Sequence, residues 1–145
     1  MIDFPPQVQD LKNRSIRTLA WLGDAEFEAE VRRRLALRGD YPTQRLNTVK
    51  ATLVRAEAQA AFLEAIENQL DPREVDVIAR GRNASHKASG RSHRNARAYR
   101  AATAFEALIA VWRYTDWTRF ETLVAPELER AIDRAIEVGA RPRRG

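Results

Sequence analysis

The sequence predicts an all-α fold in a single domain. Residues that favour helices dominate it, and no stretch alternates apolar and polar side chains for long enough to form a strand. A length of 145 residues suits one domain with its own hydrophobic core. The absence of cysteine excludes a disulfide framework and cysteine–zinc sites, and it suits the cytoplasm, where we expect the protein.

The amino-terminal half is expected to contain two long helices. Residues 1–7 include two consecutive prolines and are expected to be extended. A helix is predicted over residues 15–38, with Gly39 as its natural stop. After a short turn, a second helix is predicted to run without interruption over residues 44–68.

A short third helix has clear signals at both ends. Asp71 is a suitable N-cap, Pro72 suits the first helical position, and Glu74 completes a capping box. Gly81 is expected to end this helix.

Two helical regions are predicted in the carboxy-terminal half. The first covers residues 96–115, is apolar all round and should lie at the centre of the core. The second covers residues 118–138 and is interrupted near Pro126. We therefore expect one domain with its core at about residues 8–138, followed by a flexible basic tail at 139–145.

Positive charge is concentrated in one part of the chain. No acidic residue occurs over residues 77–105, whereas the formal net charge of the whole chain is only +5. A block of one sign indicates contact with a polyanion such as a nucleic acid, and a solvated basic loop without a partner is the alternative. The block contains Arg80, Arg82, Lys87, Arg91, Arg94, Arg97, Arg100 and two histidines, His86 and His93.

Two acidic residues occur on otherwise apolar helices. Asp24 follows Gly23 in LAWLGDAEFE, and Glu106 lies in TAFEALIA. A carboxylate among apolar residues is costly unless it is paired or binds a cation, and a glycine lets another backbone come close. We expect the two helices to pack at Gly23, with both acids sharing a divalent metal such as Mg²⁺. A salt bridge from each acid to an arginine is the alternative.

Four motifs in order resemble the Mini-III branch of the ribonuclease III family. They are LAWLGDAEFE, ATLVRAEAQA, ARGRNA and YRAATAFEALIA, which together span about residues 19–112. The first resembles the family's signature helix and the last its second catalytic helix. A full-length ribonuclease III also carries a double-stranded-RNA-binding domain, and too little chain follows residue 138 to form one, as in the Mini-III type.

The resemblance implies a ribonuclease III-like helical domain that forms a homodimer and cleaves double-stranded RNA with Mg²⁺, or with Mn²⁺ in its place. Asp24 and Glu106 match the family's catalytic, metal-binding acids. The products would carry 5′-phosphate and 3′-hydroxyl ends, and the substrate would be a precursor of large-subunit ribosomal RNA. The dimer would pack its signature helices together, which makes Trp21 and Phe27 candidate interface residues. Trp112 and Trp117 are expected in the core or the interface.

The motifs also depart from the larger enzymes of the family. Ala20 and Thr103 stand where those enzymes carry two further acids, which should weaken metal binding. A double-stranded-RNA-binding relative with weakened catalysis is therefore the alternative function, and a helical interaction module is a second one. Glu28 lies one turn after Asp24 and is expected either to support the metal site or to pair with an arginine.

The basic segment is the best candidate for gripping RNA, which proteins bind mainly through phosphates and 2′-hydroxyls. Arg82 and Asn83 match a family motif, whereas Arg100 is either an RNA contact or a structural partner for Glu106. Lys50 and Gln59 are interpreted as structural. The predicted RNA-binding residues are Arg80, Arg82, Asn83, Lys87, Arg91, Arg94 and Arg97.

Overall fold

The computed structural model describes residues 4–84 and 93–140, and within these ranges the protein is helical with no strand. This confirms the predicted all-α class. The α-helices are α1 (Pro6–Gln9), α2 (Ile16–Arg38), α3 (Thr43–Val54), α4 (Ala56–Ile66), α5 (Pro72–Ala84), α6 (His93–Thr115), α7 (Trp117–Leu123) and α8 (Ala125–Ala140). Two short 3-10 helices, Asp10–Asn13 and Glu67–Gln69, join neighbouring elements.

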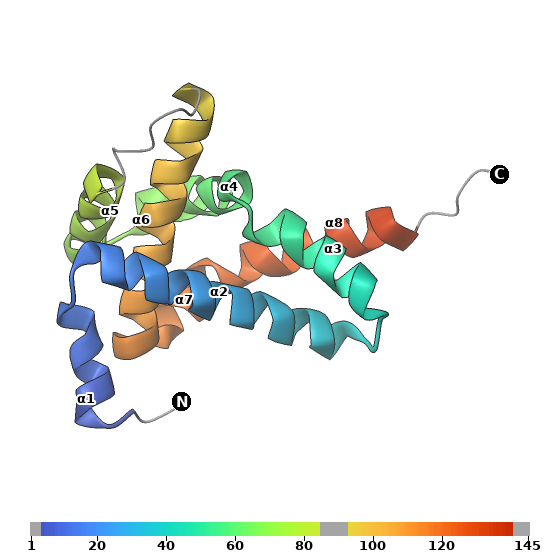
Figure 1. Cartoon of the computed structure of the whole chain (residues 1–145), viewed down its shortest axis with the longest axis horizontal. Coiled ribbons are helices and arrows are strands. Elements are labelled where there is room, and N and C mark those ends of the chain that lie inside the picture. Colours follow the sequence, from blue (N-terminus) through green and yellow to red (C-terminus); the bar gives the residue numbers. More distant parts are fainter. Residues whose placement is uncertain (1–3, 85–92, 141–145) are drawn as a thin grey trace.

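Helix α6 is the centre of the fold. It crosses behind α2 in Figure 1 and packs most extensively on α2, then on α5 and α4. Nearly every residue from Ala101 to Trp112 is buried, and Phe105 forms edge-to-face and stacked contacts with Phe27 and Phe62. The prediction of a central, all-round apolar helix is therefore confirmed.

The amino-terminal region differs from the expectation at the two prolines. Pro6 begins the one-turn helix α1 rather than an extended segment, because proline at a first helical position lacks only an N–H that would be unpaired there anyway. Helix α2 was predicted correctly. The Ser15 hydroxyl accepts a hydrogen bond from the Thr18 N–H, and the helix ends before Gly39.

The predicted long helix over residues 44–68 is wrong. Arg55 has an extended backbone (φ −65°, ψ 159°) and separates α3 from α4. The buried side chain of Gln59 donates a hydrogen bond of 2.7 Å to the Val54 carbonyl, which lies at the end of α3. No proline or glycine marks this break, so the sequence pattern alone does not reveal it.

The start of α5 was predicted correctly and its end was not. Glu74 and Asp71 exchange hydrogen bonds of 2.9 Å in the expected capping box. Helix α5 continues through Gly81 to Ala84, and a Cβ built on Gly81 would lie 2.5 Å from the Cα of Ala104. Gly81 therefore serves close packing of α5 on α6 and does not end the helix.

The last two helices follow the predicted interruption. Helix α7 ends at Leu123, and α8 begins at Ala125, with Pro126 in its first turn, where proline is tolerated. Helix α8 extends to Ala140, two residues beyond the predicted core, and the rest of the predicted basic tail lies outside the described residues.

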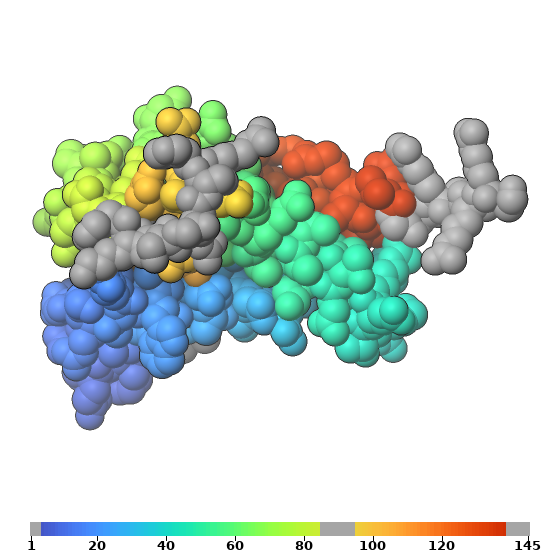
Figure 2. Space-filling model, turned by 45° about the horizontal axis from the view of Figure 1, so that its top comes forward, coloured from blue at the N-terminus to red at the C-terminus, as the bar shows by residue number. Residues whose placement is uncertain are grey.

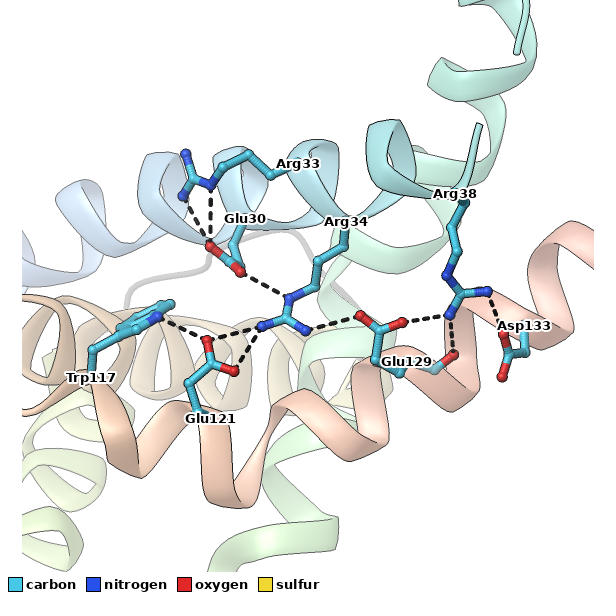
Figure 3. A network of polar contacts seen from close by, with 8 residues as sticks. All are labelled: Glu30, Arg33, Arg34, Arg38, Trp117, Glu121, Glu129 and Asp133. Atoms are coloured by element: carbon cyan, nitrogen blue, oxygen red, sulfur yellow. Dashed lines mark hydrogen bonds and ion pairs between the residues drawn. The ribbon is translucent and has the colours of Figure 1, made fainter. Parts of the chain in front are cut away.

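A network of charged side chains fixes α2 to α7 and α8. The Arg34 guanidinium donates to Glu30 of its own helix at 2.8 Å, to Glu121 at 3.0 Å and to Glu129 at 2.9 Å (Figure 3). Arg38 pairs with Glu129 and Asp133 one turn further along. Because these arginines are partly buried and make several bonds each, the network holds α8 in a defined position.

No helix in the described part of the chain is long and apolar enough to cross a membrane.

Candidate active site

The site is built at the crossing of α2 and α6. A Cβ placed on Gly23 would lie only 1.6 Å from the backbone carbonyl oxygen of Glu106. No other residue type fits here without moving a backbone. This close approach of two helices at Gly23 is what the sequence predicts, and it places the neighbouring Asp24 beside Glu106.

Asp24 and Glu106 form a directly interacting pair. Burial, together with the hydrogen-bonding and charge interaction with the facing Asp24 carboxyl, raises the pKa of Glu106 to about 9. Asp24 is exposed and Glu106 is partly buried, so neither acid is fully enclosed by the apolar residues of its helix. Where no cation is bound, the Glu106 carboxyl is therefore protonated at neutral pH.

The alternative of two salt bridges is not what this arrangement shows. Among the described residues neither acid forms an ion pair with an arginine or lysine. The residue Arg100, suggested as a partner of Glu106, instead lines a hollow between α4 and α6.

The donor set of the pair fits a hard divalent cation. Two carboxyl groups with one solvent-facing member offer oxygen ligands of the kind that Mg²⁺ prefers, together with access for water. No group of three or more Asp, Glu or His side chains that could hold a metal occurs in the described ranges, 4–84 and 93–140. The protein thus supplies few ligands, and waters or a substrate would complete the coordination.

The neighbouring positions agree with this small ligand set. Ala20 is buried, and the Thr103 hydroxyl donates to the Tyr99 carbonyl of its own helix at 3.0 Å. Glu28 pairs with Arg32 at 2.8 Å and with Lys50 at 3.5 Å. This confirms Glu28 as an arginine partner and gives Lys50 the structural role expected of it.

The structure describes the side chains of only some of the predicted RNA-binding residues. Arg80 pairs with Asp76 at 3.3 Å, and Arg82 makes two hydrogen bonds to Glu67, at 2.6 and 3.2 Å. Asn83 and Arg97 are exposed on α5 and α6. Lys87, Arg91 and His86 lie outside the described residues, and Arg94 and His93 are described only as parts of the α6 backbone.

The basic segment contains no acidic residue, but acidic side chains from another helix lie beside it in the structure. Arg82, Arg97 and Arg100 share a hollow of about 730 Å³ with three glutamates of α4 and the turn after it, which are Glu57, Glu64 and Glu67. Sequence reasoning missed this neighbourhood. The spacing of the three glutamates, which places them on one side of a helix, was the available signal.

The four large aromatic residues divide between core and surface. Phe27 and Trp112 are almost completely buried within the single chain, so the suggestion of Phe27 as an interface residue is wrong. Trp117 is partly buried and stacks on Phe120 with ring centroids 4.2 Å apart. Trp21 is 74% exposed on the same helix as Asp24, which excludes it from the core of the single chain.

The chain is similar in sequence and fold to known proteins. The chain matches the ribonuclease III domain over residues 17–116. It is 45% identical to the Mini-ribonuclease 3 of Symbiobacterium thermophilum over 92 residues, which are 63% of this chain and 70% of that protein. It is 36% identical to the Mini-ribonuclease 3 of Gloeobacter violaceus over 123 residues, which are 83% of this chain and 84% of that protein.

Two further relatives extend the comparison. The Mini-ribonuclease 3 of Desulfitobacterium hafniense is 40% identical over 101 residues, and the match spans 70% of this chain and 63% of the relative's length. A crystal structure of a protein from Fusobacterium nucleatum has a TM-score of 0.64 at 29% identity and covers 90% of this chain and 98% of that chain. From the domain match over residues 17–116 and these relatives, the chain belongs to the ribonuclease III family of endoribonucleases, in its Mini-ribonuclease 3 branch.

Proposed function

We propose that this protein cleaves double-stranded RNA at the pair formed by Asp24 and Glu106, whose carboxylates would hold Mg²⁺ or Mn²⁺. The observation that carries the proposal is the facing pair of acids at the Gly23 crossing, where neither acid has an arginine or lysine partner among the described residues. Two facing carboxyl groups without a cation are unfavourable for folding, and a divalent ion removes that cost.

The two acids have different tasks in this proposal. Asp24 is exposed, so its carboxylate can be reached by an RNA phosphate and its bound waters. Glu106 is partly buried and is fixed by the contact of its own backbone with Gly23. Because its pKa is raised, Glu106 must release its proton before its carboxylate can act as a ligand. A divalent ion at this position would lower the pKa of a water and neutralise charge on the scissile phosphate.

The substrate grip is assigned to the basic side of α5 and α6. Asn83, Arg94 and Arg97 lie on these helices, and Lys87 and Arg91 belong to the segment between them. Arg80 and Arg82 also belong to this grip, although each forms an ion pair with an acidic residue of the chain. Each would have to leave or share an acidic partner in order to meet a phosphate.

The proposal also covers the substrate, the products, the oligomeric state and the location of the protein. The substrate is a structured precursor of large-subunit ribosomal RNA, the products carry 5′-phosphates, and the protein acts as a homodimer in the cytoplasm. The alternative is a double-stranded-RNA-binding relative with weakened catalysis. The buried Ala20 and the internally bonded Thr103 favour this alternative, because neither can add a carboxylate to the site.

The test is cleavage of a labelled RNA duplex in Mg²⁺ by Asp24→Asn and Glu106→Gln. Each change keeps the side chain's shape and removes a ligand charge, so we expect the cleavage rate to fall by at least ~100-fold with RNA binding retained. Glu28→Gln is the matched control, because Glu28 lies one turn further along α2 and is paired with Arg32. Near-normal cleavage by either mutant would show that the site is wrongly assigned. An inactive parent protein that still binds the duplex would favour the alternative function.

A further inference from the structure

An apolar groove lies on a side of the protein that the cleavage proposal does not use. It has a volume of about 550 Å³ and runs between α3, α4 and α8. Figure 2 shows the red α8 directly against the green surface of α3 and α4. Neither Asp24, Glu106 nor any residue of the basic segment 77–105 lines it.

The floor of the groove is apolar, and many residues in its walls have small side chains. Val49, Leu53 and Phe62 form the buried part of the floor, and alanines of α4 and α8 form much of the walls. Val138 stands 67% exposed at the end that α8 contributes. Alanine walls let another backbone approach closely, and exposed apolar side chains gain free energy when a partner covers them.

The groove offers almost no polar groups for a small polar ligand. Its only uncharged polar side chains are Thr48 and Thr52, and each hydroxyl already donates to a carbonyl of α3, at 3.0 and 2.7 Å. A small-molecule site normally adds a few polar groups to an apolar pocket in order to orient its ligand. This lining therefore suits an apolar surface better than a small polar molecule.

All the ionisable side chains that line the groove are positive. Arg45, Arg55 and Arg134 surround the apolar floor, and no acid is among the lining residues. Arg45 is fixed by a hydrogen bond of 3.1 Å to the Ile136 carbonyl and lies over the ring of Tyr41. None of the three forms an ion pair with a carboxylate in the described part of the chain.

This lack of ion pairs contrasts with the arginines on the other side of α8. Arg34 and Arg38 each bind two or more carboxylates there (Figure 3). An unpaired cationic rim around an apolar floor is complementary to a surface with apolar anchors and flanking carboxylates. An amphipathic helix presents such a surface when apolar residues recur at i, i+3 or i+4, and i+7.

We infer that this groove binds an acidic amphipathic helix of a protein partner. The chain's own carboxy-terminal residues are a poor occupant, because Arg141, Arg143 and Arg144 carry the same charge as the rim. An RNA duplex is also disfavoured, since phosphates and riboses would gain nothing from the apolar floor. The inference does not depend on the proposed cleavage activity.

The experiment uses the full-length protein and a fluorescein-labelled 18-residue helical peptide. The peptide carries a leucine stripe at i, i+3, i+7 and i+10 with glutamates on both flanks. One control peptide has the same composition with the stripe scrambled, and another replaces glutamate by lysine. We expect saturable binding of the first peptide in fluorescence anisotropy and little binding of either control.

Protein variants then locate the binding site. Arg55→Glu/Arg134→Glu reverses two exposed rim charges, and we expect it to weaken peptide binding by about tenfold or more. Val138→Asp should weaken it as well, because it removes an exposed apolar contact. Arg73→Glu is the matched control, since Arg73 is exposed, lies on α5 and forms no ion pair in the described chain. Circular dichroism verifies that each variant is folded.

Every other outcome overturns the inference. Absence of binding, equal binding of the scrambled peptide, or equal loss in Arg73→Glu would each show that the groove does not select this helix. Sedimentation tests a different occupant: if the double reversal converts a dimer to a monomer, the groove is an interface between copies of this chain. Displacement of the peptide by an RNA duplex, with a matching loss of RNA affinity in the double reversal, would make it a nucleic-acid surface.

Discussion

Gly23 positions Asp24 and Glu106 because it has no side chain. Alanine at this position would favour the helix by roughly 1 kcal/mol on intrinsic propensity. The added methyl would, however, meet the Glu106 carbonyl at 1.6 Å, so α2 and α6 would have to separate. The position therefore gives up local helix stability for a contact that brings two acids together.

We predict that Gly23→Ala lowers both stability and cleavage. The free energy of unfolding should fall by about 3 kcal/mol, since a backbone rather than a flexible side chain must move. Urea denaturation and duplex cleavage measure the two effects. Ala25→Gly is the control on the exposed side of the same helix, and it should cost about 1 kcal/mol from propensity alone with cleavage preserved. A Gly23→Ala protein that is as stable and active as the parent would contradict the close contact.

Glu74 has a second role beyond its capping box. It accepts hydrogen bonds from Trp112 Nε1 at 2.6 Å and from the Arg119 guanidinium at 2.6 and 2.9 Å, which ties α5 to α6 and α7. Burial acts to raise the pKa of Glu74, but the bonds from Arg119, the Asp71 backbone and Trp112 outweigh it and lower that pKa below its usual value.

This lowered pKa has a definite consequence for stability. The folded pKa lies below the unfolded one, so the contribution of Glu74 is present above about pH 4.5 and is lost as pH falls through the folded value. Glu74→Gln should therefore lower the free energy of unfolding by about 2–3 kcal/mol at pH 7, and by less at pH 4. Denaturant titrations at both pH values test this. Glu127→Gln breaks an exposed pair with Arg130 and should cost at most about 0.5 kcal/mol at pH 7.

At the scale of the helix, the predictions succeeded where capping chemistry marks an end. Ser15 and the Asp71–Glu74 box begin α2 and α5 as expected, and α2 ends before Gly39. The predictions failed where packing between helices determines where a helix breaks or continues. The break at Arg55 is supported by the distant side chain of Gln59, and Gly81 lies inside a helix because α6 passes close to it.

The candidate site shows the same limit. The motifs predicted that the helices of Asp24 and Glu106 meet at Gly23, and the structure has this contact. The sequence could not show that Asp24 is exposed, nor that Glu57, Glu64 and Glu67 share a hollow with the arginines of the basic segment. The exposure depends on how α2 packs and the hollow on how α4 lies against α6, and nothing within a single helix indicates either arrangement.

The basic segment can be tested as one element. Changing Lys87, Arg91 and Arg94 to glutamine should weaken RNA duplex binding, because each phosphate contact releases counterions. The slope of log affinity against log salt should flatten by up to about 3 units if all three meet phosphate. Cleavage should show a raised KM that low salt partly rescues.

Arg82 is best changed separately, since it also holds Glu67 and its loss affects folding as well as charge. Arg73→Gln serves as the control, being an exposed arginine outside the segment. An unchanged salt slope in the triple variant would leave the segment as a solvated surface and would assign the RNA grip elsewhere.

For the molecule as a whole, the charged network and the α6 core hold α2 against its neighbours at both ends. Its amino-terminal half contacts α6 at Gly23, and its carboxy-terminal half is held to α7 and α8 by Arg34 and Arg38 (Figure 3). A helix fixed on one side leaves its opposite side available for another subunit. That exposed side carries Trp21 and, three residues later, Asp24.

The last prediction is that the protein is a homodimer joined through Trp21. An indole that is 74% exposed would gain about 2–3 kcal/mol if a second copy covered it. Multi-angle light scattering at micromolar concentration should give twice the mass of the 145-residue chain. Trp21→Glu should shift the mass to that of the monomer and reduce duplex cleavage, because one subunit offers only a short RNA-binding surface. Leu37→Glu changes another highly exposed apolar residue near the far end of α2 and should leave the dimer intact. A fully active monomer of the parent protein would contradict the prediction, and a dimer that survives Trp21→Glu would assign the interface to another surface.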